Sequence, residues 1–161
     1  MHFTGGVQRI RCIDWFENDL GFTTCEQQGL IQFYDLYPEN GQVGGRLQDI
    51  EVNKKDVKFT SVVNIPGRPY EALAVGNEYK FTYCHMEVKN ASKAQDPDAI
   101  ISQIVITPSG KSVIAGVGEE GKPGSIQVWI RSDDKALERS NKEDIQAHSK
   151  PIDRIRLTDD C

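Results

Sequence analysis

The sequence contains no run of roughly 18 consecutive apolar residues, the length a helix needs to span a bilayer. Its first residues, Met1–Gly6, have neither the basic region nor the apolar region of a secretory signal. The 161-residue chain is 38% hydrophobic and 27% charged, which is typical of a globular chain rather than a disordered one. We therefore expect a folded cytoplasmic chain without a membrane span.

Cysteine is scarce. Cys12, Cys25, Cys84 and Cys161 are scattered and form no C-x-x-C motif. Because no secretory signal is recognised, a reducing compartment and free thiols are expected. Cys12 and Cys25 are predicted to lie on adjacent strands, close to each other. Buried, reduced thiols are favoured for this pair, and a disulfide is the alternative.

Clustered positive charge is also missing. The formal net charge is −5, with 24 acidic residues against 19 Lys and Arg. This argues against nucleic acid or an anionic membrane as the main partner, since phosphate binding requires grouped cations. The local pairs Arg9 with Arg11 and Arg154 with Arg156 each place two charges on one side of a strand. They are interpreted as exposed strand charges, with an acidic protein surface as the alternative partner.

The sequence contains no G-x-S-x-G, P-loop or H-E-x-x-H motif. Gly116–Gly121 matches G-x-G-x-x-G, but Lys122-Pro123-Gly124 follows where a phosphate-binding helix would have to begin, so a turn is predicted. Cys84-His85-Met86 alternate across a strand and cannot easily share one metal ion. We therefore predict no enzyme activity, cofactor or metal; an enzyme with a β-rich pocket is the weakest hypothesis.

A repeated strand pattern is the main positive feature. Four segments align on apolar positions that begin at Ile10, Phe59, Ile101 and Ile152, with spacings of 49, 42 and 51 residues. A period near 45 residues with several short strands per copy is typical of a β-propeller, whose blades are four-stranded antiparallel sheets. The predicted fold class is therefore all-β.

Each of the first three copies continues with a second and a third apolar run, and the third ends in an aromatic residue. The predicted units are residues 3–45, 46–95 and 96–146, and residues 147–161 start a further one. The segment Leu47–Val52 is predicted as an outer edge strand that begins the second unit. The charged stretch Arg131–Gln146 lacks an apolar stripe and is predicted as a long solvated loop flanking a short strand, with one helical turn as an option. The second runs are 20–25, 70–75 and 112–117, and the third runs are 30–34, 79–83 and 126–129.

These motifs resemble the WD-repeat family. Gly29-Leu-Ile-Gln-Phe-Tyr34-Asp35 and Gly124-Ser-Ile-Gln-Val-Trp129 are similar to its closing strand, the segment Pro108-Ser-Gly110 to an inter-strand turn, and Ala147-His148 to its first element. The resemblance implies a propeller whose rim and faces bind proteins without catalysis. Its motifs are degenerate, and the family's His–Ser/Thr–Trp–Asp network is complete in no unit. The structural positions it implies are Trp15, Gly29, Tyr34, Asp35, Gly110, Trp129 and His148.

Four of these positions carry further expectations. The resemblance places His148 between blades as a hydrogen-bonding residue, and an acid/base role is the alternative. Trp15 and Trp129, with Phe33 and Tyr34, are predicted to be core anchors, because aromatic side chains supply much of the burial in small blades.

A narrower resemblance concerns Glu143–Ile152 with the following Arg156–Asp160. These residues look like the second propeller of a cilia- and flagella-associated WD-repeat protein. That resemblance implies a structural scaffold in the axoneme, near inner dynein arms or the dynein regulatory complex. Its partners would be axonemal dynein, microtubule-associated or dynein-regulatory proteins. The alternative is a cytosolic WD-repeat adaptor in a signalling or trafficking complex.

The repeats amount to about three and a third blades. Closed propellers need about 4–8 blades, and an incomplete ring leaves strand edges and apolar faces unsealed. We therefore expect this chain to be part of a larger propeller.

Overall fold

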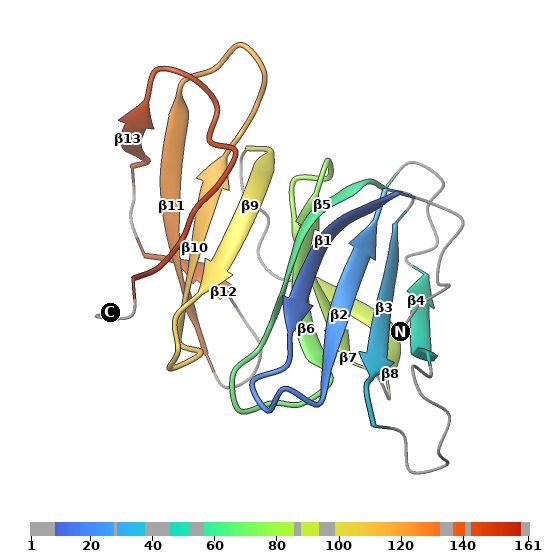
Figure 1. Cartoon of the computed structure of the whole chain (residues 1–161). Coiled ribbons are helices and arrows are strands. Elements are labelled where there is room, and N and C mark those ends of the chain that lie inside the picture. Colours follow the sequence, from blue (N-terminus) through green and yellow to red (C-terminus); the bar gives the residue numbers. More distant parts are fainter. Residues whose placement is uncertain are drawn as a thin grey trace.

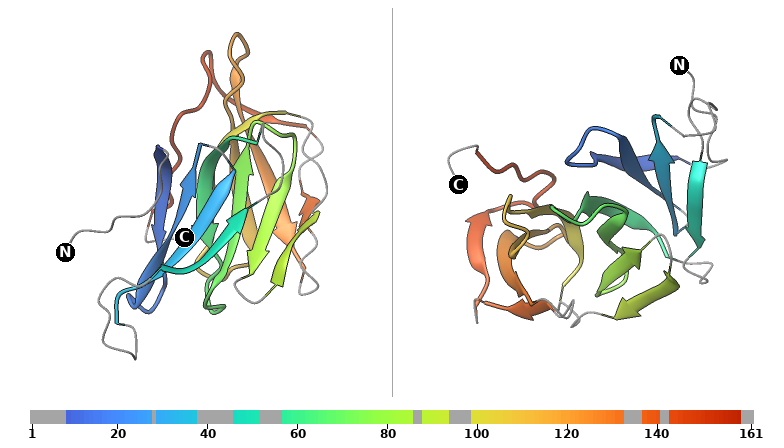
Figure 2. Two further views of the ribbon diagram at one scale, coloured as in Figure 1. Left: turned by 90° about the vertical axis from the view of Figure 1, so that its right-hand side faces the viewer. Right: turned by 90° about the horizontal axis from the view of Figure 1, so that it is seen from below.

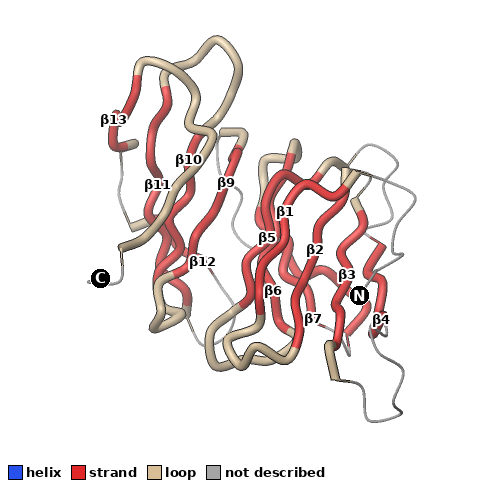
Figure 3. The backbone as a smooth tube through the Cα atoms, viewed as in Figure 1, coloured by secondary structure: helices blue, strands red, loops and turns tan. Residues whose placement is uncertain are grey.

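The computed structural model is built from strands and loops, and its described residues contain no helix and thus none that could cross a membrane (Figures 1 and 3). This confirms the predicted all-β class. Alternating apolar and polar residues, rich in β-branched and aromatic side chains, favour strands in each repeat. The residues that the structure describes are 9–27, 29–37, 46–51, 57–85, 88–93, 99–132, 137–140 and 143–158.

The first sheet is an antiparallel meander of four strands in the order β1-β2-β3-β4. Asn18 and Asp19 make the first turn: the Asn18 side-chain oxygen accepts from Leu20 N at 3.0 Å, and Asp19 adopts a φ of 57°. Asparagine and aspartate tolerate this left-handed conformation, so the chain reverses within a few residues. The strands are β1 (Ile10–Trp15), β2 (Gly21–Glu26), β3 (Leu30–Asp35) and β4 (Arg46–Glu51).

The second and third sheets repeat this meander. The second has the order β5-β6-β7-β8, and the third contains β9-β10-β11 with β12 and β13 both paired to β11. Three repeats therefore give three blades, as predicted. The strands are β5 (Phe59–Asn64), β6 (Glu71–Gly76), β7 (Phe81–His85), β8 (Val88–Lys93), β9 (Ile101–Ile106), β10 (Ser112–Val117), β11 (Gly124–Arg131), β12 (Leu137–Arg139) and β13 (Ile145–His148).

Two predicted unit boundaries differ from the sheet boundaries. Arg46–Glu51 was assigned to the second unit, but β4 pairs with β3 and closes the first sheet. The stretch Arg131–Gln146 was predicted as a long solvated loop flanking a short strand, and the structure places two short strands there: Leu137–Arg139 and Ile145–His148 pair with opposite halves of β11. They form one interrupted outer strand, so His148 ends the third blade rather than opening a fourth. Three or four residues are too few to show an alternating pattern, which is why the positions of these strands could not be predicted.

The three sheets lie side by side in an arc, which Figure 2 shows from below. β1 contacts β5, and β5 contacts β9, so the first strands of the sheets form the inner side of the arc. One core cluster fills each junction between neighbouring sheets. Phe33, Val62 and Cys84 belong to the first junction. Phe81 and Trp129 meet edge to face at the second junction, 5.0 Å apart. Each blade is therefore stabilised by burial against its neighbour.

A polar contact is repeated at every junction. The side chain of the third residue in one copy of the repeat meets the backbone of the fourth residue in the next copy. The contacts are Cys12 Sγ with Val62 O at 3.6 Å, Ser61 Oγ accepting from Ile104 N at 3.3 Å, and Gln103 Oε1 accepting from Ile155 N at 2.6 Å. The sheets are thus held in a fixed register by equivalent residues.

The second residue of the repeat supplies a further repeated contact. Thr60 Oγ1 donates to Val75 O at 3.2 Å and to Ile101 O at 3.1 Å. Ser102 Oγ contacts Gly116 O at 3.1 Å and, correspondingly, the carbonyl oxygen of Ile152. Ile152 therefore takes the same place on the third sheet that Ile101 takes on the second.

The segment after β13 follows the predicted fourth copy of the repeat, although the structure assigns it no strand. Ile152 is buried and its N–H donates to Val117 O at 3.1 Å. Gly116 permits this close approach, because a Cβ there would lie 2.8 Å from Ile152 Cγ2. Residues 152–155 thus occupy the position of a first strand beside the third blade.

Candidate protein-interaction surface

One face of the first sheet carries a row of aromatic side chains from three strands. Trp15, Phe22 and Tyr34 are direct neighbours in register across β1, β2 and β3. The Trp15 and Phe22 rings lie 5.4 Å apart at 61°, and Phe22 stacks on Tyr34 at 4.8 Å and 15°. Phe22 and Tyr34 are buried, whereas Trp15 is 56% exposed. We call the face with Ile13, Trp15, Phe22 and Tyr34 the outer face.

The corresponding face of the other two sheets is an interface. Ile13, Val62 and Ile104 are the fourth residues of their repeats and occupy equivalent registers in the three sheets. Val62 and Ile104 are each 1% exposed because the preceding sheet covers them, but Ile13 is 53% exposed. In the described part of the chain, the main contacts of β1 are with β2, beside it in the sheet, and with β5, on its opposite face. The outer face therefore has the composition of a blade junction without the neighbouring blade.

The prediction that Trp15 anchors the core is wrong. Cys12 and Asp14 point toward β5, so strand alternation sends Ile13 and Trp15 to the opposite face. The predictions for Phe33, Tyr34 and Trp129 are confirmed, as all three are buried. Tyr34 and Trp129 lie at equivalent registers, and Trp129 is covered by the second sheet.

The other WD-like positions lie mostly in turns. Gly29 and Gly110 have φ values of 78° and 67°, which favour glycine, and Gly110 O accepts from Arg131 Nε at 2.7 Å. Asp35 ends β3 and accepts from Tyr37 N at 2.9 Å. His148 is exposed, opposite Gly124 on the edge of the third sheet, so the expected position between blades is wrong. The outer strand runs along β11 there, away from the junction.

The third blade contains a polar cluster that the sequence did not reveal. Asp144 Oδ2 accepts from Ser125 Oγ at 2.6 Å and from Gln127 Nε2 at 3.4 Å, and Asp144 also pairs with Arg139. Asp144 lies between β12 and β13, where the outer strand is interrupted. The cluster joins the two halves of that strand to β11, so its role is structural. The buried Trp129 Nε1 has no hydrogen-bond partner in the described part of the chain.

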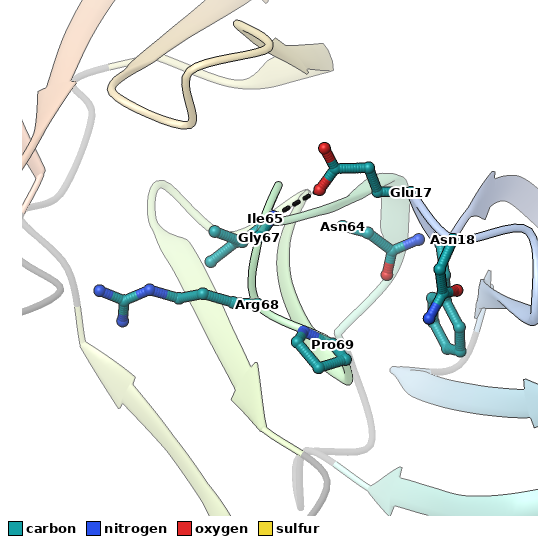
Figure 4. A pocket seen from close by; sticks show the side chains of 8 residues that line it. Glu17, Asn18, Asn64, Ile65, Gly67, Arg68 and Pro69 are labelled. Atoms are coloured by element: carbon teal, nitrogen blue, oxygen red, sulfur yellow. Dashed lines mark hydrogen bonds between the residues drawn. The ribbon is translucent and has the colours of Figure 1, made fainter.

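A pocket of about 250 Å³ opens between the turns of the first two blades (Figure 4). Phe16, Glu17 and Asn18 come from the β1–β2 turn, and Asn64 with the 65–69 turn comes from the second sheet. Glu17 Oε2 accepts from Gly67 N at 2.6 Å and so fixes the two turns to each other.

Beneath this pocket, Asp14 joins the two sheets. Its Oδ2 accepts from Asn64 N at 2.6 Å, and its carbonyl oxygen accepts from Asn64 Nδ2 at 2.8 Å. Asn64 Oδ1 accepts in turn from Thr23 Oγ1 at 2.6 Å. Burial raises the pKa of the Asp14 carboxyl, against the lowering effect of these hydrogen bonds.

Among the described residues, Glu17 and Arg68 are the charged side chains that line the pocket. Arg68 is also held by Glu71, 3.6 Å away. Among residues that the structure describes, no group of three His, Cys, Asp or Glu is placed to hold a metal ion. Of the predicted Cys84-His85-Met86 run, Cys84 is in the core, His85 lies 3.6 Å from Glu71, and Met86 falls outside the described residues.

Comparison with known proteins assigns the fold. A chain in a solved structure titled "Crystal Structure of Mitotic Checkpoint Complex" is similar to this one, with a TM-score of 0.70 and 13% sequence identity. The match covers 94% of this chain and 45% of that chain, so this sequence spans less than half of the solved relative. The sequence matches no protein-family model and no curated protein. The likeness shows the fold, which is that of antiparallel β-propeller blades forming an incomplete ring.

Proposed function

We propose that this chain is part of a non-catalytic protein-interaction scaffold, and that its outer face binds a further four-stranded blade. The observation that carries the proposal is the contrast between Ile13, at 53% exposure, and the equivalent Val62 and Ile104, at 1%. The same register position is buried wherever a blade precedes it.

The chemistry of the outer face supports a β-sheet as its occupant. Ile13 and Trp15 together expose a large apolar area next to the stacked Phe22 and Tyr34 rings. Complete burial of one such side chain contributes about 1.5–3 kcal/mol. For a blade that covered both exposed residues, apolar burial would therefore contribute several kcal/mol of favourable binding free energy. The entropic cost of association is subtracted from this contribution. The rim pocket at Glu17 and Arg68 lies at the edge of the same blade and adds a polar recess for a protein side chain.

Association of the purified chain tests the outer face. Size-exclusion chromatography with light scattering should show concentration-dependent self-association of the wild type through this apolar face. Ile13→Asp and Trp15→Asp should shift the chain toward monomer. Tyr79→Asp is the matched control, since Tyr79 is a similarly exposed aromatic residue, at 49%, outside the outer face. Equal effects of Trp15→Asp and Tyr79→Asp would contradict the proposal.

The finer part of the proposal is a location in the ciliary or flagellar axoneme, near inner dynein arms or the dynein regulatory complex. Its support is the resemblance of Glu143–Ile152 to a cilia- and flagella-associated WD-repeat protein. Detergent extraction of isolated cilia should leave the protein with the axoneme. Complete release into the soluble fraction, together with the absence of ciliary immunofluorescence, would contradict this location. It would not contradict the proposal that the chain is part of a scaffold.

A catalytic role has a separate test. The Glu17 carboxylate in the pocket lining accepts from Gly67 N, which favours a structural role over a catalytic one. A thermal-shift screen against nucleotides and sugars should give no large stabilisation. A shift that saturates with one such compound and is lost in Arg68→Ala would instead indicate a small-molecule site.

A further inference from the structure

Cys12 and Cys25 face each other across the first two strands of the first blade. They are direct Cα partners in the antiparallel pairing of β1 with β2, so their side chains lie on the same side of the sheet. Such partners have Cα atoms about 4.5–5.5 Å apart, depending on the hydrogen-bonding position. A disulfide requires about 4.4–6.8 Å. Direct strand partners therefore have a backbone separation that a disulfide can span, and both residues are free thiols in the structure.

We propose that Cys12 and Cys25 are a site of reversible oxidation, at which a peroxide converts the two thiols into an intramolecular disulfide. The two cysteines have distinct roles. Cys12 packs against the core cluster of the first junction but keeps intermediate exposure, so it is the more accessible of the two sulfurs to a small oxidant. Cys25 is fully buried beside it and resolves the oxidised form.

The surroundings of Cys12 favour its thiolate. A hydrogen bond from the Cys25 thiol lowers the pKa of Cys12 to about 6, with a smaller contribution from the Val62 backbone and against the effect of burial. The same hydrogen bond, together with burial, raises the pKa of Cys25, which remains a thiol. At neutral pH the pair therefore holds one proton, with the reactive sulfur at the more accessible position.

The reaction balances with hydrogen peroxide as the two-electron oxidant. The Cys12 thiolate attacks one peroxide oxygen, the O–O bond breaks, and the departing hydroxide takes a proton to form water, leaving a sulfenic acid. The Cys25 sulfur then attacks the Cys12 sulfur, and its proton leaves with the sulfenic hydroxyl as a second water. Two thiols and one peroxide give one disulfide and two waters, and a dithiol reductant reverses the change.

Cys84 provides an internal contrast. It is also in the first junction, but its direct strand partner is Ala72, and burial raises its pKa to about 12. Cys84 should therefore stay reduced under conditions that oxidise the pair. Cys161 lies outside the described residues, and the test uses a Cys161→Ala background so that it cannot contribute.

Proteolysis after Glu17 tests the bond directly, because this residue lies between the two cysteines. The folded chain is treated with stoichiometric hydrogen peroxide, free thiols are alkylated, and the product is cut with a glutamate-specific protease. Met1–Glu17 and Asn18–Glu26 should then appear as one species, lighter than their sum by two hydrogens. Dithiothreitol should separate them. Failure to find this species while Cys12 is oxidised to sulfinic acid, or its formation only after denaturation, would overturn the proposal.

Variants separate the two roles. Cys12→Ser should fold, since Ser61 occupies the equivalent position in the second blade, and should leave Cys25 unoxidised. Cys25→Ala should divert Cys12 to sulfinic acid or to a mixed disulfide with added glutathione. Circular dichroism checks that each variant is folded. Oxidation of Cys25 at the wild-type rate in Cys12→Ser would contradict the assignment of Cys12 as the attacking residue.

Discussion

Two isoleucines at the same repeat position provide the sharpest test of the blade arrangement. Ile13 and Ile104 occupy equivalent places in β1 and β9, but Ile13 is 53% exposed and Ile104 is 1% exposed. Ile104→Ala removes buried methyl groups and leaves a cavity at the second junction, which costs about 2–5 kcal/mol. Ile13 is only about half buried, so Ile13→Ala loses about half of the free energy gained by burying this side chain, and it creates no cavity. The free energy of unfolding should therefore fall by about 1 kcal/mol.

Urea unfolding followed by far-ultraviolet circular dichroism measures the difference. Dilute protein is used so that self-association does not contribute. With an m-value of about 2 kcal/mol/M, the midpoint should fall by about 1–2.5 M for Ile104→Ala and by about 0.5 M for Ile13→Ala. Ile104→Val and Ile13→Val should give smaller shifts in the same order. Equal shifts, or a larger one at Ile13, would show that the outer face is covered and would refute the contrast in exposure between the first sheet and the other two.

Three further outcomes are expected. Asp14→Ala should lower the free energy of unfolding by about 1–3 kcal/mol, because the Asn64 N–H at the first junction loses its acceptor. Asp14→Asn keeps an oxygen at this position and should recover most of the loss, as measured in the same urea titration. The iodoacetamide alkylation rate of Cys12 should rise with pH around a midpoint of about 6, and Cys25→Ala should move that midpoint upward, whereas an unmoved midpoint would contradict the hydrogen bond between the thiols. On heating at concentrations at which it self-associates, the purified chain should aggregate through its uncovered strand edges and apolar face, and a fully reversible melt of a monomer at the same concentrations in calorimetry would contradict an open ring.

The strand content of the fold could be predicted because each repeat carries its own alternating apolar pattern. Phe59–Asn64 and Ile101–Ile106 are strands where the β-branched runs predicted them. The interrupted outer strand of the third blade could not be predicted in this way. Leu137–Arg139 and Ile145–His148 are too short to show a period, and they are strands because β11 presents an edge to them.

The candidate surface could be predicted only in part from the sequence. The aromatic character of Trp15 and Tyr34 was recognised, but both were assigned to the core. Nothing near Trp15 in the sequence indicates which face of β1 meets β5. The contacts of Cys12 with Val62 and of Asp14 with Asn64 decide this, and each joins residues 50 positions apart. The predicted proximity of Cys12 and Cys25 is confirmed, since adjacent strands of one meander must pair with each other.

Local sequence alone determined that the chain would form successive antiparallel blades, because hydrophobic alternation and turn residues act within each repeat. Only the tertiary structure decided which blade faces are buried and which face of the first sheet is left exposed. Those properties depend on the sheet that packs alongside, and that sheet is contributed by residues about one repeat away. Ile13 and Ile104 have the same side chain and the same repeat position, yet water reaches one of them and a neighbouring blade covers the other.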